Sequence, residues 1–160
     1  MDTQLTLLLH IVDEGYNHRA WHGPNLWGSL RGLSADQASW RPADTRHNIW
    51  EIAVHCAYWK YAVRRRILGL KRGSFPLDGS NWFPRLDNLT ADRWKSDLRL
   101  LAQEHHLLRE VIVKLSVTRL KQSAPGGAVR MDHLICGVAA HDVYHAGQIQ
   151  LVRKLQQGQP

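Results

Sequence analysis

The sequence predicts an all-α protein, a four-helix bundle built from a single domain over residues 1–160. Four long segments repeat apolar residues every three or four positions, which is the spacing of one face of a helix. No stretch shows the two-residue alternation of a half-buried strand. A length of 160 residues suits one domain with one hydrophobic core.

The first helical segment is predicted from Thr3 to Leu30. Pro24 is expected to kink or break it, because proline lacks the amide proton that an interior helical turn needs. A short turn of helix follows at residues 34–37, where Ser-Ala-Asp-Gln has the pattern of a capping box, and it ends before Arg41-Pro42.

The second long helix is predicted over residues 45–69. Residues 70–89 show no helical pattern, and a loop of this length in a compact domain is typically a functional cover or a mobile segment. Its aromatic residues are expected either to close over a pocket or to pack on the bundle. They are Phe75, Trp82 and Phe83.

The third helix is predicted to follow a Thr90 N-cap, with an apolar stripe from Trp94 to Leu115. A Pro-Gly-Gly turn at residues 125–127 separates it from the fourth, whose stripe runs from Leu134 to Leu155. Both stripes alternate steps of four and three over three heptads, which is typical of a helical bundle.

Composition predicts a cytoplasmic protein without a membrane span. No apolar run approaches the roughly 20 residues that a spanning helix needs, and the N-terminal stretch lacks the basic start of a secretory signal. Two cysteines without a CxxC motif are too few for a disulfide framework. Cys56 and Cys136 are both expected to be buried apolar fillers.

Polar residues interrupt the fourth stripe where a bundle normally places Leu, Ile or Val: His141, His145 and Gln148. Burying an imidazole or amide without a partner costs on the order of 1–3 kcal/mol. Residues four apart on a helix have Cβ atoms about 5–6 Å apart on one face, so His141 and His145 can bind one metal ion. A pair of satisfied core histidines is the less favoured interpretation.

The motif His141-Asp142-Val143-Tyr144-His145 does not fit the zincin protease pattern HExxH. Asp142 replaces the catalytic Glu, and no residue after His145 is His, Asp, Glu or Cys. A third protein ligand must therefore lie upstream. His55 and His105 both fall at apolar-face positions, and His55 is modestly favoured because its neighbours are apolar, whereas those of His105 are polar.

Three stretches resemble the DinB/YfiT-like superfamily of four-helix bundles. They are residues 33–42, residues 48–59 around His55, and residues 141–148, which are the most specific; Trp94 also fits. The resemblance implies a divalent metal bound by His55, His141 and His145. It also implies a thiol-dependent transferase or isomerase or a metal-dependent hydrolase, often a dimer, and a low-molecular-weight thiol as a possible cofactor.

Three imidazoles leave a bound ion with open positions, which suits an enzyme that activates water or a thiol on a small-molecule substrate. The ligand set fits Zn, Ni, Fe(II) or Co. Glu51 and Gln148 are candidates to orient an imidazole or a bound water, and His22 and His47 are candidates to line the mouth of the site. The alternative is a non-catalytic metal-binding or small-ligand-binding bundle.

A net charge of +7 makes nucleic acid the main competing partner. Arg64, Arg65 and Arg66, with Lys71 and Arg72, form a basic cluster at the end of the second helix. Such clusters are usually solvated there, and no recognition motif accompanies this one. Nucleic-acid binding is therefore the least favoured prediction, and the cluster is instead a candidate to attract an anionic substrate or thiol.

Overall fold

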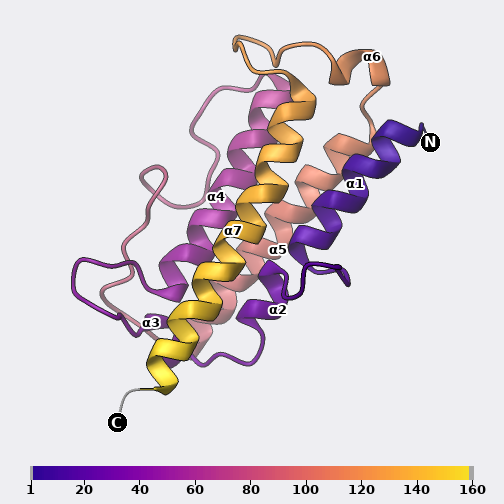
Figure 1. Ribbon diagram of the computed structural model, residues 1–160. Coiled ribbons are helices and arrows are strands. Elements are labelled where there is room, and N and C mark those ends of the chain that lie inside the picture. The colour runs from indigo at the N-terminus through magenta and orange to yellow at the C-terminus, as the bar shows by residue number, and fades with distance from the viewer. Residues whose placement is uncertain (1, 159–160) are drawn as a thin grey trace.

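The computed structural model describes residues 2–158, and it confirms the all-α bundle. Four long helices form the bundle, and three short ones connect them (Figure 1). In chain order the helices are α1 (Thr3–Tyr16), α2 (Leu26–Leu30), α3 (Ala35–Ser39), α4 (Ile49–Leu68), α5 (Ala91–Val113), α6 (Val117–Leu120) and α7 (Met131–Gln157). Within residues 2–158, no helix is both long and apolar enough to cross a bilayer.

The predicted helix from Thr3 to Leu30 is wrong in extent. α1 ends at Tyr16, and residues 17–25 are not helical before α2 begins. The helix therefore breaks before Pro24 is reached. Asn25 then caps the start of α2: its side chain accepts from the Gly28 amide at 2.8 Å and donates to the His18 carbonyl at 2.7 Å. The predicted capping box at residues 34–37 is confirmed.

The long helices run in two parallel pairs. α4 and α5 run the same way, while α1 and α7 run the opposite way (Figure 1). Since a 20-residue helix is about 30 Å long, the chain leaving α4 at Gly69 must return along the whole bundle before α5 can begin beside the start of α4. This return explains the length of the 70–89 loop, which lies along α4 and supplies residues to the site described below.

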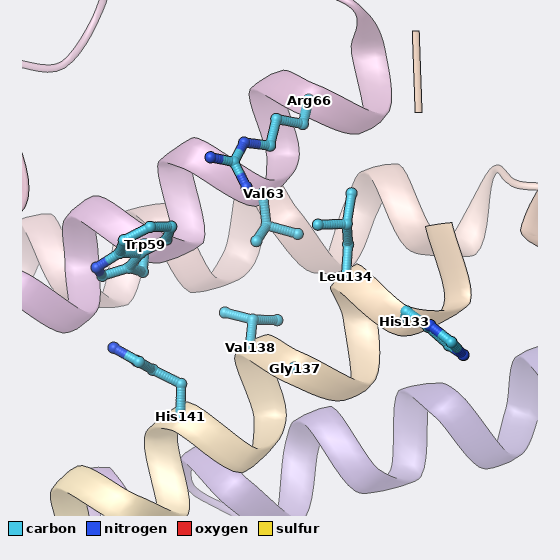
Figure 2. A pocket seen from close by; sticks show the side chains of 8 residues that line it. All are labelled: Trp59, Val63, Arg66, His133, Leu134, Gly137, Val138 and His141. Carbon is cyan, nitrogen blue, oxygen red and sulfur yellow. The ribbon is translucent and has the colours of Figure 1, made fainter. Parts of the chain in front are cut away.

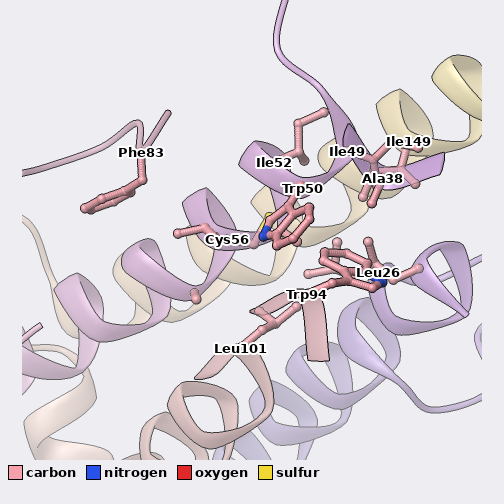
Figure 3. Close-up of a cluster of buried hydrophobic side chains, with 14 of the residues drawn as sticks. Leu26, Ala38, Ile49, Trp50, Ile52, Cys56, Phe83, Trp94, Leu101 and Ile149 are labelled. Carbon is pink, nitrogen blue, oxygen red and sulfur yellow. The ribbon is translucent and has the colours of Figure 1, made fainter. Parts of the chain in front are cut away.

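Two apolar clusters form the core, one at each end of the bundle. One surrounds Trp50 and Trp94 near the start of α4 (Figure 3), and the other joins Val12, Ile67 and Ile112 at the opposite end. Buried polar side chains separate the two clusters at mid-height, one or two from each long helix. They are Asp13, His55, Lys60, Glu104, His105, Asp142 and His145. We call these residues the polar layer.

Candidate metal centre

His55 on α4 and His141 and His145 on α7 meet at one edge of the polar layer. The Nε2 atom of His141 lies 3.0 Å from Nε2 of His55 and 3.1 Å from Nε2 of His145. His55 and His145 are buried, and His141 is half-buried. The three side chains, which we call the histidine cluster, form a group that can hold a metal ion.

Hydrogen bonds on the far side of two rings fix which nitrogen faces the shared point. Nδ1 of His55 lies 2.7 Å from the backbone carbonyl oxygen of Asn81, and Nδ1 of His145 lies 2.6 Å from Oε1 of Gln148. A carbonyl oxygen only accepts, so Nδ1 carries the proton on both rings and each Nε2 carries a lone pair. One proton on Nε2 of His141 cannot serve the Nε2 lone pairs of both His55 and His145. One cation at the shared point can accept a lone pair from all three rings.

Burial keeps these imidazoles neutral. Burial is the largest cause and neighbouring imidazoles add to it: together they lower the pKa of His55 from 6.5 to about 4, against the opposing Asn81 carbonyl, and that of His141 to about 3. Burial also lowers the pKa of His145, against the opposing effect of Gln148. All three imidazoles are therefore neutral at pH 7, and the unprotonated nitrogen of a neutral ring is the atom that binds metal.

The spacing fits a divalent ion. Two nitrogens that each lie about 2.1 Å from one ion are about 3.0 Å apart at a right-angled coordination angle and about 3.4 Å apart at a tetrahedral one. The observed separations of 3.0 and 3.1 Å suit the narrower angle, which leaves room for further ligands. Zn, Ni, Fe(II) and Co all accept imidazole at such angles, so the donor set does not choose among them.

A second group of possible ligands lies next to the cluster and suits a metal less well. Donor atoms of Cys56, His141 and Asp142 also lie within 4.8 Å of one another. Burial raises the pKa of the Cys56 thiol well above its usual value, which disfavours the thiolate that binds metal. The Asp142 carboxylate is already paired with Lys60.

Of the four residues predicted to support the site, Gln148 contacts the histidine cluster directly, and Glu51, His47 and His22 do not. Gln148 contacts His145: its Oε1 lies 2.6 Å from Nδ1 of that ring. Glu51 instead orients His47, whose Nδ1 lies 3.0 Å from Oε2, and it also pairs with Arg41 and accepts from the Arg85 amide at 2.9 Å. These contacts with Arg41, Arg85 and His47 hold the pKa of Glu51 below its usual value despite burial.

His47 and His22 lie outside the histidine cluster. The Trp82 indole stacks on His47 at 3.6 Å and on His55 at 3.8 Å, so it separates the two imidazoles. His22 is exposed in the turn between α1 and α2, and nothing in residues 2–158 joins it to the cluster by a hydrogen bond or ring contact.

Sequence reasoning missed the contribution of consecutive loop residues, Asn81 and Trp82. Asn81 has a φ of 65°, a left-handed conformation that asparagine tolerates, and its side chain also accepts from Nε1 of Trp59 at 3.0 Å. Phe75 and Phe83 pack on Tyr58 instead of on the histidines. The loop therefore both packs on the bundle and covers the cluster.

The buried pair of Lys60 and Asp142 was also missed. Both side chains are about 1% exposed, and they bond to each other across the α4–α7 interface. Oδ1 of Asp142 and Nδ1 of the adjacent His141 are buried without a hydrogen-bond partner among the described residues. Desolvation raises the pKa of Asp142 to about 6 against the opposing effect of Lys60.

His105, the alternative third ligand, lies elsewhere in the polar layer. Its ring stacks on Tyr16 at 3.8 Å, and its Nε2 lies 3.6 Å from Oδ1 of Asp13. Cys136, expected to be buried, is exposed, because α7 turns that position away from the core. Cys56 is buried as predicted.

The basic cluster is divided among separate contacts. Arg64 pairs with Glu104 at 3.0 Å, Arg65 donates to the Leu70 carbonyl at 2.9 Å, and Arg66 lies over the Trp59 ring. The three arginines therefore have three different partners, and Arg64 is the one of them that pairs with a carboxylate among residues 2–158.

Comparison with known proteins identifies the family. The model of the DinB superfamily matches residues 7–149, which include all three histidines of the cluster. Searches of curated proteins and of solved structures found no match. Because the match spans most of the sequence, the chain belongs to the DinB superfamily.

Proposed function

We propose that the protein is a metal-dependent enzyme in which His55, His141 and His145 hold a divalent ion that activates water or a thiol for transfer or hydrolysis. The observation that carries the proposal is the convergence of three neutral imidazoles whose Nε2 atoms lie 3.0–3.1 Å apart in two contacts. Among residues 2–158 no fourth ligand joins the three imidazoles, so such an ion would keep open coordination positions and would lower the pKa of a bound water or thiol.

The chain's own residues supply orientation and exclusion of water. The Asn81 carbonyl and the Gln148 amide hold His55 and His145 with Nε2 toward the shared point. Trp59 and Trp82 flank the rings and shield them from bulk solvent. His47, held by Glu51 on the outer face of Trp82, is the candidate to accept a proton at the rim of the site.

The first experiment measures metal content and open coordination. Purified protein is analysed for bound elements, and the Co(II)-substituted form is examined by visible absorption and by relaxation of exchangeable water. We expect one ion per chain with exchangeable water, followed by turnover in a screen of low-molecular-weight thiols with electrophiles and of hydrolysable esters and amides. A bound ion without exchangeable water would contradict catalysis and favour a non-catalytic binding bundle.

The matched controls are other histidines of the same chain. His106 on α5 is exposed, and its Nε2 lies 3.3 Å from Oε1 of Glu110, so His106→Ala should keep the ion. His55→Ala should lose it. Equal ion content in the two variants would overturn the proposed site.

A further inference from the structure

A groove between α4 and α7 begins at His141 and extends toward the end of α4 (Figure 2). Its volume is about 260 Å³, and its walls are mostly apolar: Trp59 and Val63 on α4 face Val138 on α7. Gly137 forms part of the α7 side, where a Cβ atom would meet nothing within 4 Å. The groove is therefore an open apolar slot with one side of the histidine cluster at its end.

Arg66 supplies the positive charge of this groove. Its guanidinium lies 5.7 Å from the centre of the Trp59 ring, and Figure 2 shows it directed over Val63. No acidic group in residues 2–158 pairs with it, whereas the neighbouring Arg64 is neutralised by Glu104. Arg66 can therefore bind an anion without giving up an existing ion pair.

The groove continues past Arg66 into a second, polar pocket of about 470 Å³. The two pockets share Arg66 and Leu134, and Arg65 and Arg72 line the second one. A molecule lying along both would pass from neutral imidazoles, over apolar side chains, to a cationic end.

We propose that this groove binds the body of the substrate, an amphipathic molecule with an apolar chain or ring and an anionic end bound by Arg66. A cavity of about 150 Å³ holds benzene, so the first pocket accommodates an apolar body somewhat larger than one aromatic ring. The inference rests on the proposed function for one point only, namely that the reacting end of the molecule lies at the histidine cluster.

The test measures binding of eight-carbon probes to the full chain by isothermal titration calorimetry. Sodium octanoate, octyl phosphate and octanol share an alkyl chain and differ in charge. We expect the two anions to bind at least tenfold more tightly than octanol, because a charge-assisted contact with arginine is added to the same apolar contact. Butanoate should bind more weakly than octanoate, since each buried methylene contributes up to about fourfold.

Two variants separate the apolar and charged parts of the groove. Gly137→Leu fills the slot with a better helix former, so it should abolish binding of all probes while the thermal midpoint stays level or rises. Its control is Gly147→Leu, an α7 glycine that also has open space around its Cβ position and does not line the groove. Arg66→Gln should weaken octanoate at least tenfold and leave octanol unchanged, while Arg99→Gln, an exposed α5 arginine, should change neither.

Three results would overturn the inference. They are equal affinity for octanoate and octanol, full octanoate binding by Gly137→Leu, and octanoate binding that survives Arg66→Gln but disappears when metal is removed. The last result would place the carboxylate at the histidine cluster. Metal content is measured on the same samples, so a protein that binds no ion but shows the expected probe pattern contradicts the proposed function alone.

Discussion

Two buried histidine sites lie in the same polar layer and differ in what surrounds them. His55 meets the imidazoles of His141 and His145, and in the described part of the chain no carboxylate forms a hydrogen bond or an ion pair with these rings. His105 is surrounded by charges: Asp13 lies 3.6 Å from its Nε2, and Arg109 binds the same carboxylate at 2.9 Å. Burial lowers the pKa of the imidazole at both sites, to about 4 for His55 and about 2 for His105.

The difference shows that burial and a low pKa do not identify a metal ligand. The histidine cluster is the candidate metal site because its Nε2 atoms converge while hydrogen bonds hold the Nδ1 protons of His55 and His145 on the opposite side. The ring of His105 faces a carboxylate that Arg109 already neutralises and stacks on Tyr16, so it belongs to the packing of the bundle.

The largest expected effect comes from removing a ligand. His141→Ala should lose stoichiometric metal binding, because two imidazoles without a third donor hold a divalent ion far more weakly, whereas His105→Gln should still bind one ion per chain. Cobalt titration followed by visible absorption measures both. If the two variants bind alike, the two histidine sites do not differ in the way described above.

A second effect comes from the lysine that lies between the two sites. Lys60→Met should lower the free energy of unfolding by about 3–5 kcal/mol, because it leaves the buried Asp142 carboxylate without its cation. Lys60→Met/Asp142→Leu should recover most of that loss, since an apolar pair removes both charges. Urea unfolding of the metal-free protein measures both variants, and a single variant as stable as the wild type would show that the pair is not buried as a charge pair.

A smaller effect is expected for the residue that orients a ligand. Gln148→Ala should weaken metal affinity by about 10–100-fold without abolishing it, because His145 loses the acceptor that holds its Nδ1 proton. Competition with a chelator of known affinity measures the change. Gln103→Ala on the exposed face of α5 is the control, and an equal loss there would show that the effect is not specific to His145.

The smallest expected effect is on how the free energy of unfolding depends on pH. It distinguishes a neutral, buried His105 from a charged His105 that is ion-paired with Asp13. His105 has a folded pKa of about 2, which lies below the ordinary value, so below about pH 6.5 the unfolded chain takes up a proton that the folded chain does not. Stability from this group is therefore lost as pH falls. Between pH 7.5 and 5.5 the wild type should lose about 1 kcal/mol more than His105→Gln in urea unfolding of the metal-free protein.

The sign depends on the charged groups around the ring. Burial and the cations Lys60 and Arg109 lower the pKa, while Asp13 lies close enough to oppose them. Should Asp13 prevail, His105 would be charged when folded, and the wild type would instead gain stability relative to the variant as pH falls.

The sequence predicts those parts of the fold that depend on the spacing of apolar residues within a single helix. The stripes of α5 and α7 were readable because each is set by residues three and four apart. The break after Tyr16 was misplaced because proline is a strong signal, whereas Asn25 acts through a cap that only the folded turn reveals. The parallel direction of α4 and α5 depends on the whole bundle and has no local signal.

The site was predictable only in part for the same reason. Polar residues in an apolar stripe pointed to His141 and His145, but periodicity alone left His55 and His105 open. Asn81 acts through its backbone carbonyl, which any residue supplies, so its side chain gave no clue. Lys60 and Asp142 are 82 residues apart, and each alone reads as an ordinary surface charge.

The contacts of Asn81 and Trp82 with His55 tie the α4–α5 loop to the histidine cluster. A bound ion that fixes the His55 ring should therefore also reduce the motion of the loop residues in contact with it. Loss of the ion should increase that motion. Cleavage by an added protease between residues 70 and 89 would therefore serve as a label-free gauge of occupancy, slowing when the histidines hold an ion and quickening when a chelator takes it away.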